Sequence, residues 1–383
     1  MELNIDKTGW KSYRFDELAQ NISQRVEPKQ TDLEVYVGLE HLDPDNLHIK
    51  RNGTPADVEG TKLKFYKGDV IFGKRRAYQR KAALAETDGI CSAHAMVLRA
   101  NTKLIDERLF PFFFHSKVFQ DISVKISVGG LSPTINWKDL SKQEFLLPPN
   151  DQQARLAEML WAADEVVERE MEVKERAVSL KRNTTTLFFD RPLHSWEERR
   201  LGDLCQIERG GSPRPIDDYF TNDKDGINWI KIGDVEIGTK YIYKTKQKIK
   251  PSGLSKSRYV KKGDLLLSNS MSFGRPFILE IDGCIHDGWL VIHDENNVFN
   301  KEFLYYYLGS ESTYNKFKKF AAGGVVDNLN SDVVKKMKVY LPTLSEQKEI
   351  TSKLLFLDDI INKVELQLSN SNNLKQGLIN EIF

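Results

Sequence analysis

An eight-residue stretch of the first half, residues 74–81, holds five cations, one tyrosine and one glutamine, with no acid among them. Arginine and glutamine side chains can form paired hydrogen bonds with the edges of guanine and adenine, and lysine or a further arginine can hold phosphates. These residue types at this density indicate nucleic-acid binding, whereas a solvated loop is the alternative for one such stretch alone. The candidate DNA contacts are Lys74, Arg75, Arg76, Tyr78, Gln79, Arg80 and Lys81.

The second half has a longer basic stretch, residues 240–262, with nine cations and again no acid. Lysines alternate with other residues over positions 244–250, so in a strand they would all project from one face. Tyr243, Thr245 and Ile249 would then pack on the opposite face. An edge strand kept soluble by its lysines is the alternative. The candidate DNA contacts here are Lys244, Lys246 and Lys248.

Residues 268–275 occupy the place in the second half that residues 74–81 occupy in the first, and they are polar instead of densely basic. If both segments read bases, they should therefore read different ones. The glycine-containing segments 129–136 and 323–330 also correspond, and they are either ordinary strand connections or DNA-facing loops. The candidate contacts of the second half are Ser268, Asn269, Ser270, Ser272, Phe273 and Arg275.

The elements that would position these side chains occur twice. LPPNDQQARLAEMLWAADEVV, which starts at Leu147, returns about 194 residues later as LPTLSEQKEITSKLLFLDDII from Leu341. Such a period is far longer than the roughly 20 to 50 residues of a solenoid repeat. It indicates a duplicated unit of one domain followed by one helix. The expected boundaries are 1–147 and 190–341 for the domains, and 148–189 and 342–383 for the helices.

Apolar residues recur at threes and fours along both helical segments, which is typical of a long helix with one apolar seam. A helix of about 35 residues is about 50 Å long, and a seam of that length must be buried. We expect the two helices to bury their seams against one another; the alternative is that each packs on its own domain. The predicted pairing residues are Leu156, Leu160, Val167 and Leu180 in the first helix and Ile350, Leu354, Leu357, Ile361, Val364 and Leu368 in the second.

The rest of each half has short alternating runs broken by glycine, proline and asparagine, which predicts α/β (α+β) domains of strands, turns and a few helices. The net charge of the 383 residues is only +1, and the three cysteines suit neither a disulfide framework nor a metal knuckle. We expect a reducing, cytoplasmic environment, because the chain starts without an apolar signal core and has no run long enough to span a membrane.

Searches for catalytic patterns fail. The sequence has no phosphate-binding Gly-x-x-x-x-Gly-Lys-Ser/Thr loop, no His-Glu-x-x-His metal motif and no Gly-x-Ser-x-Gly elbow. We therefore predict that the chain has no active site and no metal site of its own.

The repeated helical segment resembles the spacer of the specificity subunits of type I restriction-modification systems. That spacer typically reads Leu-Pro-Pro, then Glu-Gln, then Ile, Leu, Asp and Ile at helical spacing, then Leu-Lys and a closing Leu-Phe. The second copy follows it at Glu346-Gln347, Asp358 and Leu374-Lys375, and the first at Gln153, Asp164 and Leu180-Lys181. Gln152 in place of Glu and Thr343 in place of the second Pro are departures that concern the start of each helix.

This resemblance covers nearly the whole chain and implies two target recognition domains at opposite ends of an antiparallel coiled coil, related by a pseudo-twofold axis. It implies a non-catalytic subunit that reads a bipartite double-stranded DNA target, with helices that set the gap. Two modification (methyltransferase) subunits and two restriction (ATP-dependent nuclease/translocase) subunits are the implied partners, and S-adenosylmethionine, ATP and Mg would belong to them. Alternatives are a specificity subunit for a fused methyltransferase-nuclease partner, a protein-only coiled-coil scaffold, or an enzyme with a disguised site.

Overall fold

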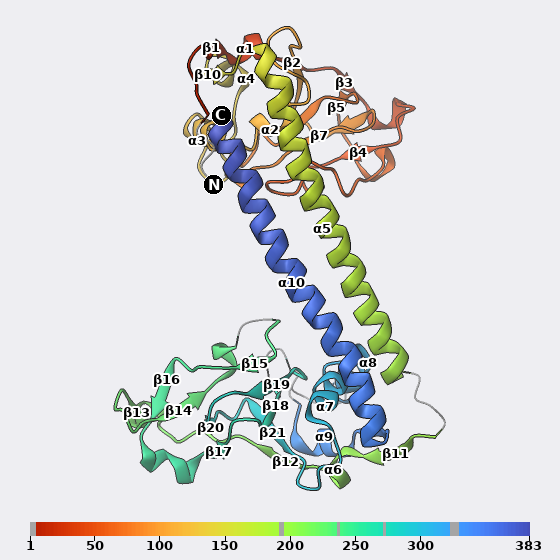
Figure 1. Ribbon diagram of the computed structural model, residues 1–383, viewed down its shortest axis with the longest axis vertical. Coiled ribbons are helices and arrows are strands. Elements are labelled where there is room, and N and C mark those ends of the chain that lie inside the picture. The colour runs from red at the N-terminus through yellow and green to blue at the C-terminus, as the bar shows by residue number, and fades with distance from the viewer. Residues whose placement is uncertain (1–4, 191–194, 236–237, 271–272, 322–328) are drawn as a thin grey trace. The chain divides into compact units, whose positions relative to one another are not determined.

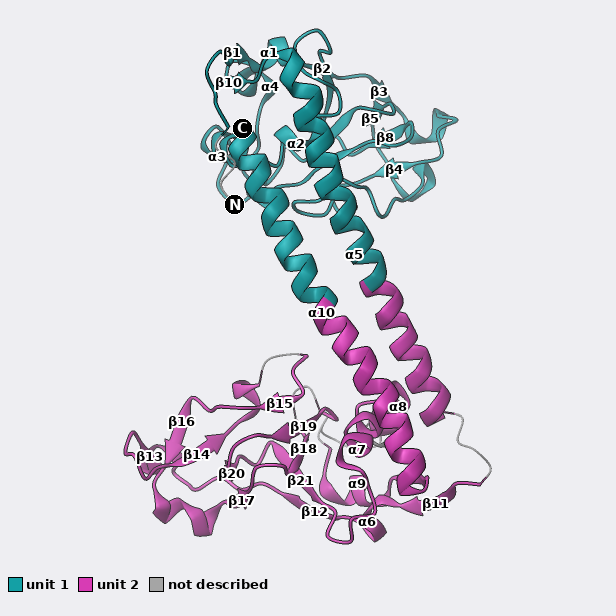
Figure 2. Ribbon diagram, viewed as in Figure 1, with its two compact units in different colours: residues 1–173, 364–383 teal, residues 174–363 magenta. Residues whose placement is uncertain are grey.

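The computed structural model describes residues 5–190, 195–235, 238–270, 273–321 and 329–383. The chain forms two compact units: Met1–Val173 with Val364–Phe383 is unit 1, and Lys174–Lys363 is unit 2 (Figure 2). Two long helices, α5 (Asn150–Asp190) and α10 (Leu344–Ile382), each contribute to both units (Figure 1). The part of each unit outside these helices is called head 1 and head 2, respectively.

Head 1 contains two four-stranded sheets and a two-stranded one. The first sheet has the order β2-β9-β6-β7 and is antiparallel throughout, and the second has the order β3-β5-β8-β4, with β4 parallel to β8. The strands are β1 (Lys11–Arg14), β2 (Ala19–Ile22), β3 (Arg25–Val26), β4 (Tyr36–Val37), β5 (Lys62–Phe65), β6 (Val70–Phe72), β7 (Ala82–Leu84), β8 (Gly89–Cys91), β9 (Met96–Ala100) and β10 (Glu144–Leu147), and the helices are α1 (Phe15–Leu18), α2 (Phe110–Phe113), α3 (Lys117–Lys125) and α4 (Trp137–Leu140).

Head 2 repeats this plan with additional strands. Its sheets have the orders β12-β21-β18-β19-β15 and β13-β16-β14-β20-β17, and β11 pairs with β22 as β1 pairs with β10. The strands are β11 (Glu197–Arg200), β12 (Gln206–Arg209), β13 (Phe220–Thr221), β14 (Ile227–Ile230), β15 (Tyr241–Ile242), β16 (Gln247–Ile249), β17 (Arg258–Val260), β18 (Leu265–Ser268), β19 (Pro276–Leu279), β20 (Gly283–Ile285), β21 (Trp289–His293) and β22 (Lys338–Leu341), and the helices are α6 (Leu201–Leu204), α7 (Lys301–Leu308), α8 (Glu311–Ala321) and α9 (Ser331–Lys336).

The turn before the central strand is the same in both heads. Gly68 and Gly263 both have a φ of 91°, in the left-handed region that glycine adopts without steric cost. The aspartate that follows accepts a hydrogen bond from a backbone N–H three residues earlier at 2.8 Å, Asp69 from Tyr66 and Asp264 from Lys261. The duplicated α+β plan expected from the sequence is therefore confirmed in structural detail.

Within each unit, a segment of α5 packs against an antiparallel segment of α10 (Figure 2). In unit 1, the start of α5 lies beside the end of α10; in unit 2, the end of α5 lies beside the start of α10. The closing aromatic residue of each helix enters a head core. Phe383 meets the ring of Phe113 at 5.3 Å between centroids, and Phe189 meets that of Phe303 at 5.5 Å. The expected antiparallel pairing of the two helices is thus present in both units.

Buried glutamines fix the start of each long helix. The Gln153 side chain accepts from Asp106 N at 2.6 Å and donates to the carbonyls of Leu104 and Pro148, both at 2.9 Å. Gln347 repeats the pattern: it accepts from Asn300 N at 2.7 Å and donates to the carbonyls of Val298 and Pro342, both at 3.0 Å. One side-chain amide thus pairs three backbone groups, two in the head and one just before the long helix, and so connects the helix start to the head. Over the described ranges, no helix is long and apolar enough to cross a bilayer.

Candidate nucleic-acid interface

The basic segment of head 1, residues 74–81, is a fixed turn at the end of β6. Its centre is a single 3-10 turn, Ala77–Gln79, flanked by Arg76 and Arg80 with left-handed φ angles of 57° and 54°. Such angles are uncommon away from glycine and persist only where neighbouring contacts hold them. Arg76 N donates to Pro133 O at 2.7 Å, and the buried side chain of Ala77 packs in the core of head 1. The flanking cations are therefore held in a defined arrangement.

The cations of this segment fall into two groups. Arg80 forms an ion pair with Asp45 at 2.8 Å, and Lys81 donates to Leu39 O at 2.6 Å. Both side chains therefore bind to other parts of head 1. Arg76 donates to Ser132 Oγ at 3.2 Å, and Arg75 approaches His94 Nε2 at 3.4 Å. Among the described residues, no carboxylate forms an ion pair with Lys74, Arg75 or Arg76, which leaves their charges available to a ligand. Tyr78 is half exposed and Gln79 half-buried at the same turn.

The glycine-containing loop, residues 129–136, packs on this turn. Thr134 forms a bridge with Arg75, and Ile135 N donates to Lys74 O at 2.9 Å. Leu131, at the loop tip, is 96% exposed. The loop and the basic turn, which are far apart in sequence, thus form one continuous surface.

A pocket of about 400 Å³ opens beside Lys74. Arg25 of β3 and Lys62 of β5 share its lining, and neither was predicted as a DNA contact. Partial burial, and then the positive charges of Arg75, Lys74 and Lys62, lower the pKa of His94 at its edge. The sequence could not have indicated this cluster, because its members are isolated cations brought together only by strand pairing.

In head 2, the corresponding segment is mostly structural. Ser268 and Asn269 are buried; Ser268 Oγ accepts from Arg275 N at 3.0 Å, and Asn269 donates to Asp287 O at 2.9 Å. Their side chains close the β18–β19 turn and are not exposed to a duplex, which corrects the expectation that they contact DNA. Arg275 is exposed, and Phe273 stacks on Tyr314 with ring centroids 5.9 Å apart. Ser270 is half-buried, and Ser272 lies outside the described residues.

The lysines of residues 244–250 do not share one strand. β15 ends at Ile242 and β16 covers only Gln247–Ile249, because Thr245 Oγ1 donates to Gln247 O at 2.9 Å and turns the chain between the two strands. The prediction of one strand with all lysines on one face is therefore wrong. Tyr243, expected to pack inward, is 65% exposed, whereas Ile249 is buried as expected. Lys244 and Lys246 are exposed, and Lys248 is half-buried.

Head 2 also neutralises the cations near its central turn. Asp287 lies 4.0 Å from Arg209, 3.8 Å from Arg214 and 2.9 Å from His286. Head 1 has Ala93 at the equivalent position, as the matching strands β8 and β20 and the turns that follow them indicate. The two heads therefore share a fold and differ in the charge they present.

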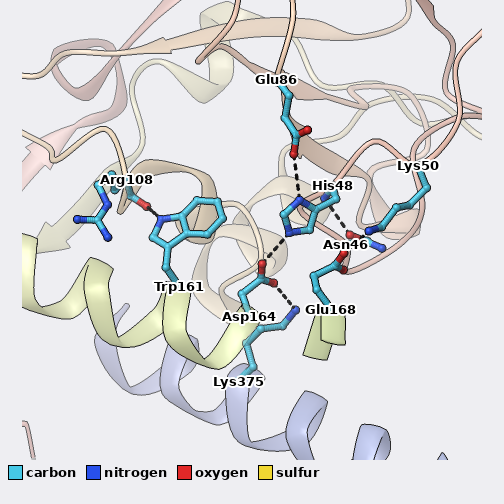
Figure 3. Close-up of polar contacts among 9 residues, drawn as sticks. All are labelled: Asn46, His48, Lys50, Glu86, Arg108, Trp161, Asp164, Glu168 and Lys375. Atoms are coloured by element: carbon cyan, nitrogen blue, oxygen red, sulfur yellow. Dashed lines mark hydrogen bonds and ion pairs between the residues drawn. The ribbon is translucent and has the colours of Figure 1, made fainter. Parts of the chain in front are cut away.

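In each unit, an acid–lysine pair connects the two long helices. In unit 1, Asp164 of α5 contacts Lys375 of α10 at 3.0 Å and His48 of head 1 at 2.7 Å (Figure 3). In unit 2, Lys181 of α5 contacts Asp358 of α10 at 2.5 Å. Although burial opposes it, contact with His48 and Lys375 lowers the pKa of Asp164, and the same contact raises the pKa of His48. The Asp and the Lys of the Leu-Lys pair, which recur in both helical segments of the sequence, therefore contact each other across the helices in both units.

The predicted pairing residues are mostly shielded from solvent, and some of them, among them Leu160 and Leu354, belong to the cores of the heads. Leu180 is 54% exposed, because the seam on this turn passes through Ala177 and Lys181 instead. This corrects the expectation for Leu180. The remaining positions are buried (Leu160, Val167, Ile350, Leu354, Leu357 and Val364) or half-buried (Leu156, Ile361 and Leu368).

In the described part of the chain, no group of three His, Cys, Asp or Glu side chains is arranged to hold a metal ion. All three cysteines are buried and free, and burial raises the pKa of Cys91 and Cys205 to about 12. Such thiols stay protonated and are poor nucleophiles.

Comparison with known proteins gives one consistent result. The family model described as "Type I restriction modification DNA specificity domain" matches residues 8–176 and again residues 194–376. The EcoDI specificity subunit of Escherichia coli is 29% identical over 180 residues, 44% of this chain and 39% of that protein, so the chain spans well under half of it. The putative MjaX specificity subunit of Methanocaldococcus jannaschii is 23% identical over 89% of this chain and 84% of its own length.

Solved structures agree on the fold. The S subunit of a type I restriction-modification system from M. genitalium matches with a TM-score of 0.62 and 16% identity, over 100% of this chain and 98% of that one. A chain from a structural study of the assembly and conformational transition of a type I R-M system matches with a TM-score of 0.63 and 19% identity, over 98% and 97% of the two chains.

Proposed function

The chain belongs to the type I restriction-modification specificity subunits, whose DNA specificity domain it contains twice, and on this premise we propose that each head reads one half of a bipartite double-stranded DNA target. The observation that carries the proposal is the turn at the end of β6. It holds Lys74, Arg75 and Arg76 in a fixed conformation with no acid paired to them among the described residues. Arginine is the side chain best suited to paired hydrogen bonds with guanine, and lysine to phosphate.

The two heads read different half-sites in this proposal. Head 1 presents unpaired cations beside Tyr78 and Gln79, whereas head 2 presents Arg275, Phe273 and Ser270 at the corresponding turn and neutralises other cations with Asp287. Different donors and acceptors at equivalent positions are what two unlike half-sites require. The exposed Lys244 and Lys246 would hold phosphates, which position the protein without reading sequence.

The chain acts without catalysis of its own, as the adaptor of a larger enzyme. Two modification subunits and, in the complete enzyme, two restriction subunits would carry S-adenosylmethionine, ATP and Mg. The paired helices would fix the gap between half-sites, since a helix has a constant rise per residue. Exposed apolar side chains along α5, among them Val166, Leu180 and Leu187, would dock the modification subunits, because such residues are costly to leave in water. A cytoplasmic location follows from this role.

The test is DNA binding by the chain in complex with its modification subunit, followed by mapping of methylated bases in a host that expresses the complex. A bipartite motif with a constant gap is the expected result. A complex that binds no duplex of any sequence would contradict the proposal. Unchanged DNA affinity after reversal of the charges of Arg75 and Arg76 would favour a protein-only scaffold, and methyl transfer or cleavage by the chain alone would establish an enzyme.

A further inference from the structure

The pocket beside Lys74 in head 1 is lined by cations and amides without an acid. Arg25, Lys62 and Lys74 come from β3, β5 and the end of β6, and the amides of Asn21 and Asn136 complete the polar part of the lining. No Asp or Glu contributes to its wall. Lys62 Nζ already donates to Gly60 O at 2.9 Å, and Arg25 is exposed. The three like charges still repel each other, and an anion placed among them would be attracted by all three.

Lys74 is the cation of this pocket whose charge is half-buried without a partner among the described residues. Its side chain is half-buried, and partial burial lowers its pKa. Among the described residues, neither a hydrogen bond nor an ion pair of its ammonium group is present, unlike those of Lys81 and Arg80 on the same turn. Desolvating a charge without pairing it is expensive. An anion in the pocket would supply the missing partner.

Head 2 has different side chains at the positions equivalent to this pocket. Asn269 is the head 2 residue equivalent to Lys74. The equivalence is shown by matching backbone bonds: Leu329 N donates to Asn269 O at 2.8 Å, and Ile135 N donates to Lys74 O at 2.9 Å. Trp289, fully buried, stands where head 1 has Ala95, and Asp287 stands where head 1 has Ala93. In head 2, two positions that line the pocket of head 1 thus carry a carboxylate that lies beside Arg209 and Arg214 and a tryptophan that packs in the core around Leu266.

We propose that this pocket of head 1 binds one backbone phosphate of the DNA half-site read by that head. The proposal rests on the proposed function. A phosphate carries a full negative charge on its acceptor oxygens, whereas a base edge is neutral, and the cationic groups of this pocket can only donate. The contact anchors the half-site and sets its register, and it carries no base preference of its own.

The experiment measures DNA binding by the full chain with its modification subunit. Each backbone phosphate of the first half-site is replaced in turn by a neutral methylphosphonate. The wild type should lose about tenfold in affinity at one position, the size expected for one charge-assisted contact. Lys74→Met should lose about as much affinity on unmodified DNA and show no further loss when the same phosphate is replaced. The slope of log affinity against log salt concentration should fall by about 1, and the methylated motif should stay unchanged.

Two further variants guard against misfolding and general charge effects. Ala93→Asp places the carboxylate of head 2 at an exposed position of head 1, where folding tolerates it, and should reproduce the effect of Lys74→Met. Lys142→Met removes an exposed lysine that does not line the pocket and should leave the single-position loss intact.

Other outcomes overturn the inference separately from the proposed function. Wild-type affinity of Lys74→Met and Ala93→Asp, in a complex that still recognises its motif, would refute the phosphate pocket alone. A changed first half of the motif in Lys74→Met would assign Lys74 to base reading instead. Binding of inorganic phosphate that depends on Lys74, with DNA affinity unaffected by its loss, would assign the pocket to a free anion. Absence of all DNA binding by the wild type would reject the proposed function itself.

Discussion

The buried glutamines at the starts of α5 and α10 connect each helix to the head that precedes it. Replacing Gln347 with leucine keeps the volume but leaves Asn300 N and the carbonyls of Val298 and Pro342 without partners. Buried groups left unpaired cost about 1 to 3 kcal/mol each. We expect Gln347→Leu to lower the free energy of unfolding by about 2 to 4 kcal/mol, measured by urea denaturation.

A matched control exists on the same helix. Gln367 is exposed on α10, so Gln367→Leu should change stability by less than about 0.5 kcal/mol. Gln153→Leu should behave as Gln347→Leu does, since its bonds are the same. If both Gln347→Leu and Gln367→Leu had the same small effect, the buried bonds would not be stabilising the helix start.

The heads pair their equivalent aspartates with different bases. Asp69 receives two hydrogen bonds from Arg99, at 2.7 and 2.9 Å, whereas Asp264 lies 3.7 Å from His293. The contact with Asp264 raises the pKa of His293. A raised folded-state pKa means that the stabilisation is fully present below the ordinary histidine value of about 6.5 and is lost as the pH rises through the raised value.

We therefore expect unit 2 to lose stability above about pH 6.5, and His293→Arg to remove that loss, because arginine stays charged. Denaturant midpoints measured from pH 5.5 to 8.5 would check this. Unit 1 already has a pH dependence of the same sign, because Asp164 raises the pKa of His48, and the reciprocal variant Arg99→His should increase it. Parallel pH curves for wild type and His293→Arg would contradict the assignment of the effect to this pair.

Several residue-level features could be predicted from the sequence, and others could not. Gln152 and Thr343 depart from the typical spacer sequence, and the structure explains both departures together. Thr343 N and Oγ1 both donate to Glu346 at 2.8 Å, whereas Pro149, at the equivalent place, has no N–H to satisfy, so Gln152 suffices there. Whether a cation is paired could not be predicted, because it depends on chain segments distant in sequence: Asp45 pairs with Arg80, and no carboxylate among the described residues pairs with Lys74.

At the scale of elements, the acid–lysine contacts between α5 and α10 differ in burial. The Asp164 and Lys375 side chains are 3% and 9% exposed, whereas those of Asp358 and Lys181 are 25% and 33% exposed. Removing one partner of a buried pair leaves an uncompensated charge, but an exposed pair contributes little. We expect Lys375→Met to cost about 2 to 4 kcal/mol and Lys181→Met about 1 kcal/mol in free energy of unfolding.

Double-mutant cycles would measure these couplings directly. Asp164→Asn combined with Lys375→Met should recover part of the cost of the single change, since the buried carboxylate is then neutral. His48 remains beside Asp164 in the single variant and limits its cost (Figure 3). Equal costs for Lys375→Met and Lys181→Met would show that burial does not control the contact.

The helices also show how far periodicity predicts packing. Leu160, Val167 and Leu354 were identified by their spacing and are buried. Leu180 was placed on the same seam but faces outward, because an α-helix of 3.6 residues per turn drifts from a spacing of threes and fours over several turns. The prediction of one strand over residues 244–250 was wrong for a related reason. Alternation predicts a strand only where the backbone keeps pairing with a neighbouring strand, and a turn at Thr245 interrupts that pairing.

At the scale of the whole molecule, each head is completed by both long helices. Phe189 at the end of α5 packs in the core of unit 2, and Phe383 after α10 packs in the core of unit 1. Each core therefore depends on a helix that began in the other half of the sequence. Unit 1 is therefore built from two separate segments, Met1–Val173 and Val364–Phe383, whereas unit 2 is the single segment Lys174–Lys363.

The proposed reading of one half-site by each head predicts independent changes in the two halves of the DNA motif. Arg75→Ala should weaken discrimination at one or two base pairs of a single half-site by about 1 to 3 kcal/mol, and Arg275→Ala should do so only in the other half. Because the two residues belong to separate units with no shared partner, the double variant should combine both changes additively. Sequencing of methylated sites in hosts that express each variant complex measures all three motifs, and a single substitution that altered both halves would show that the heads do not read separately.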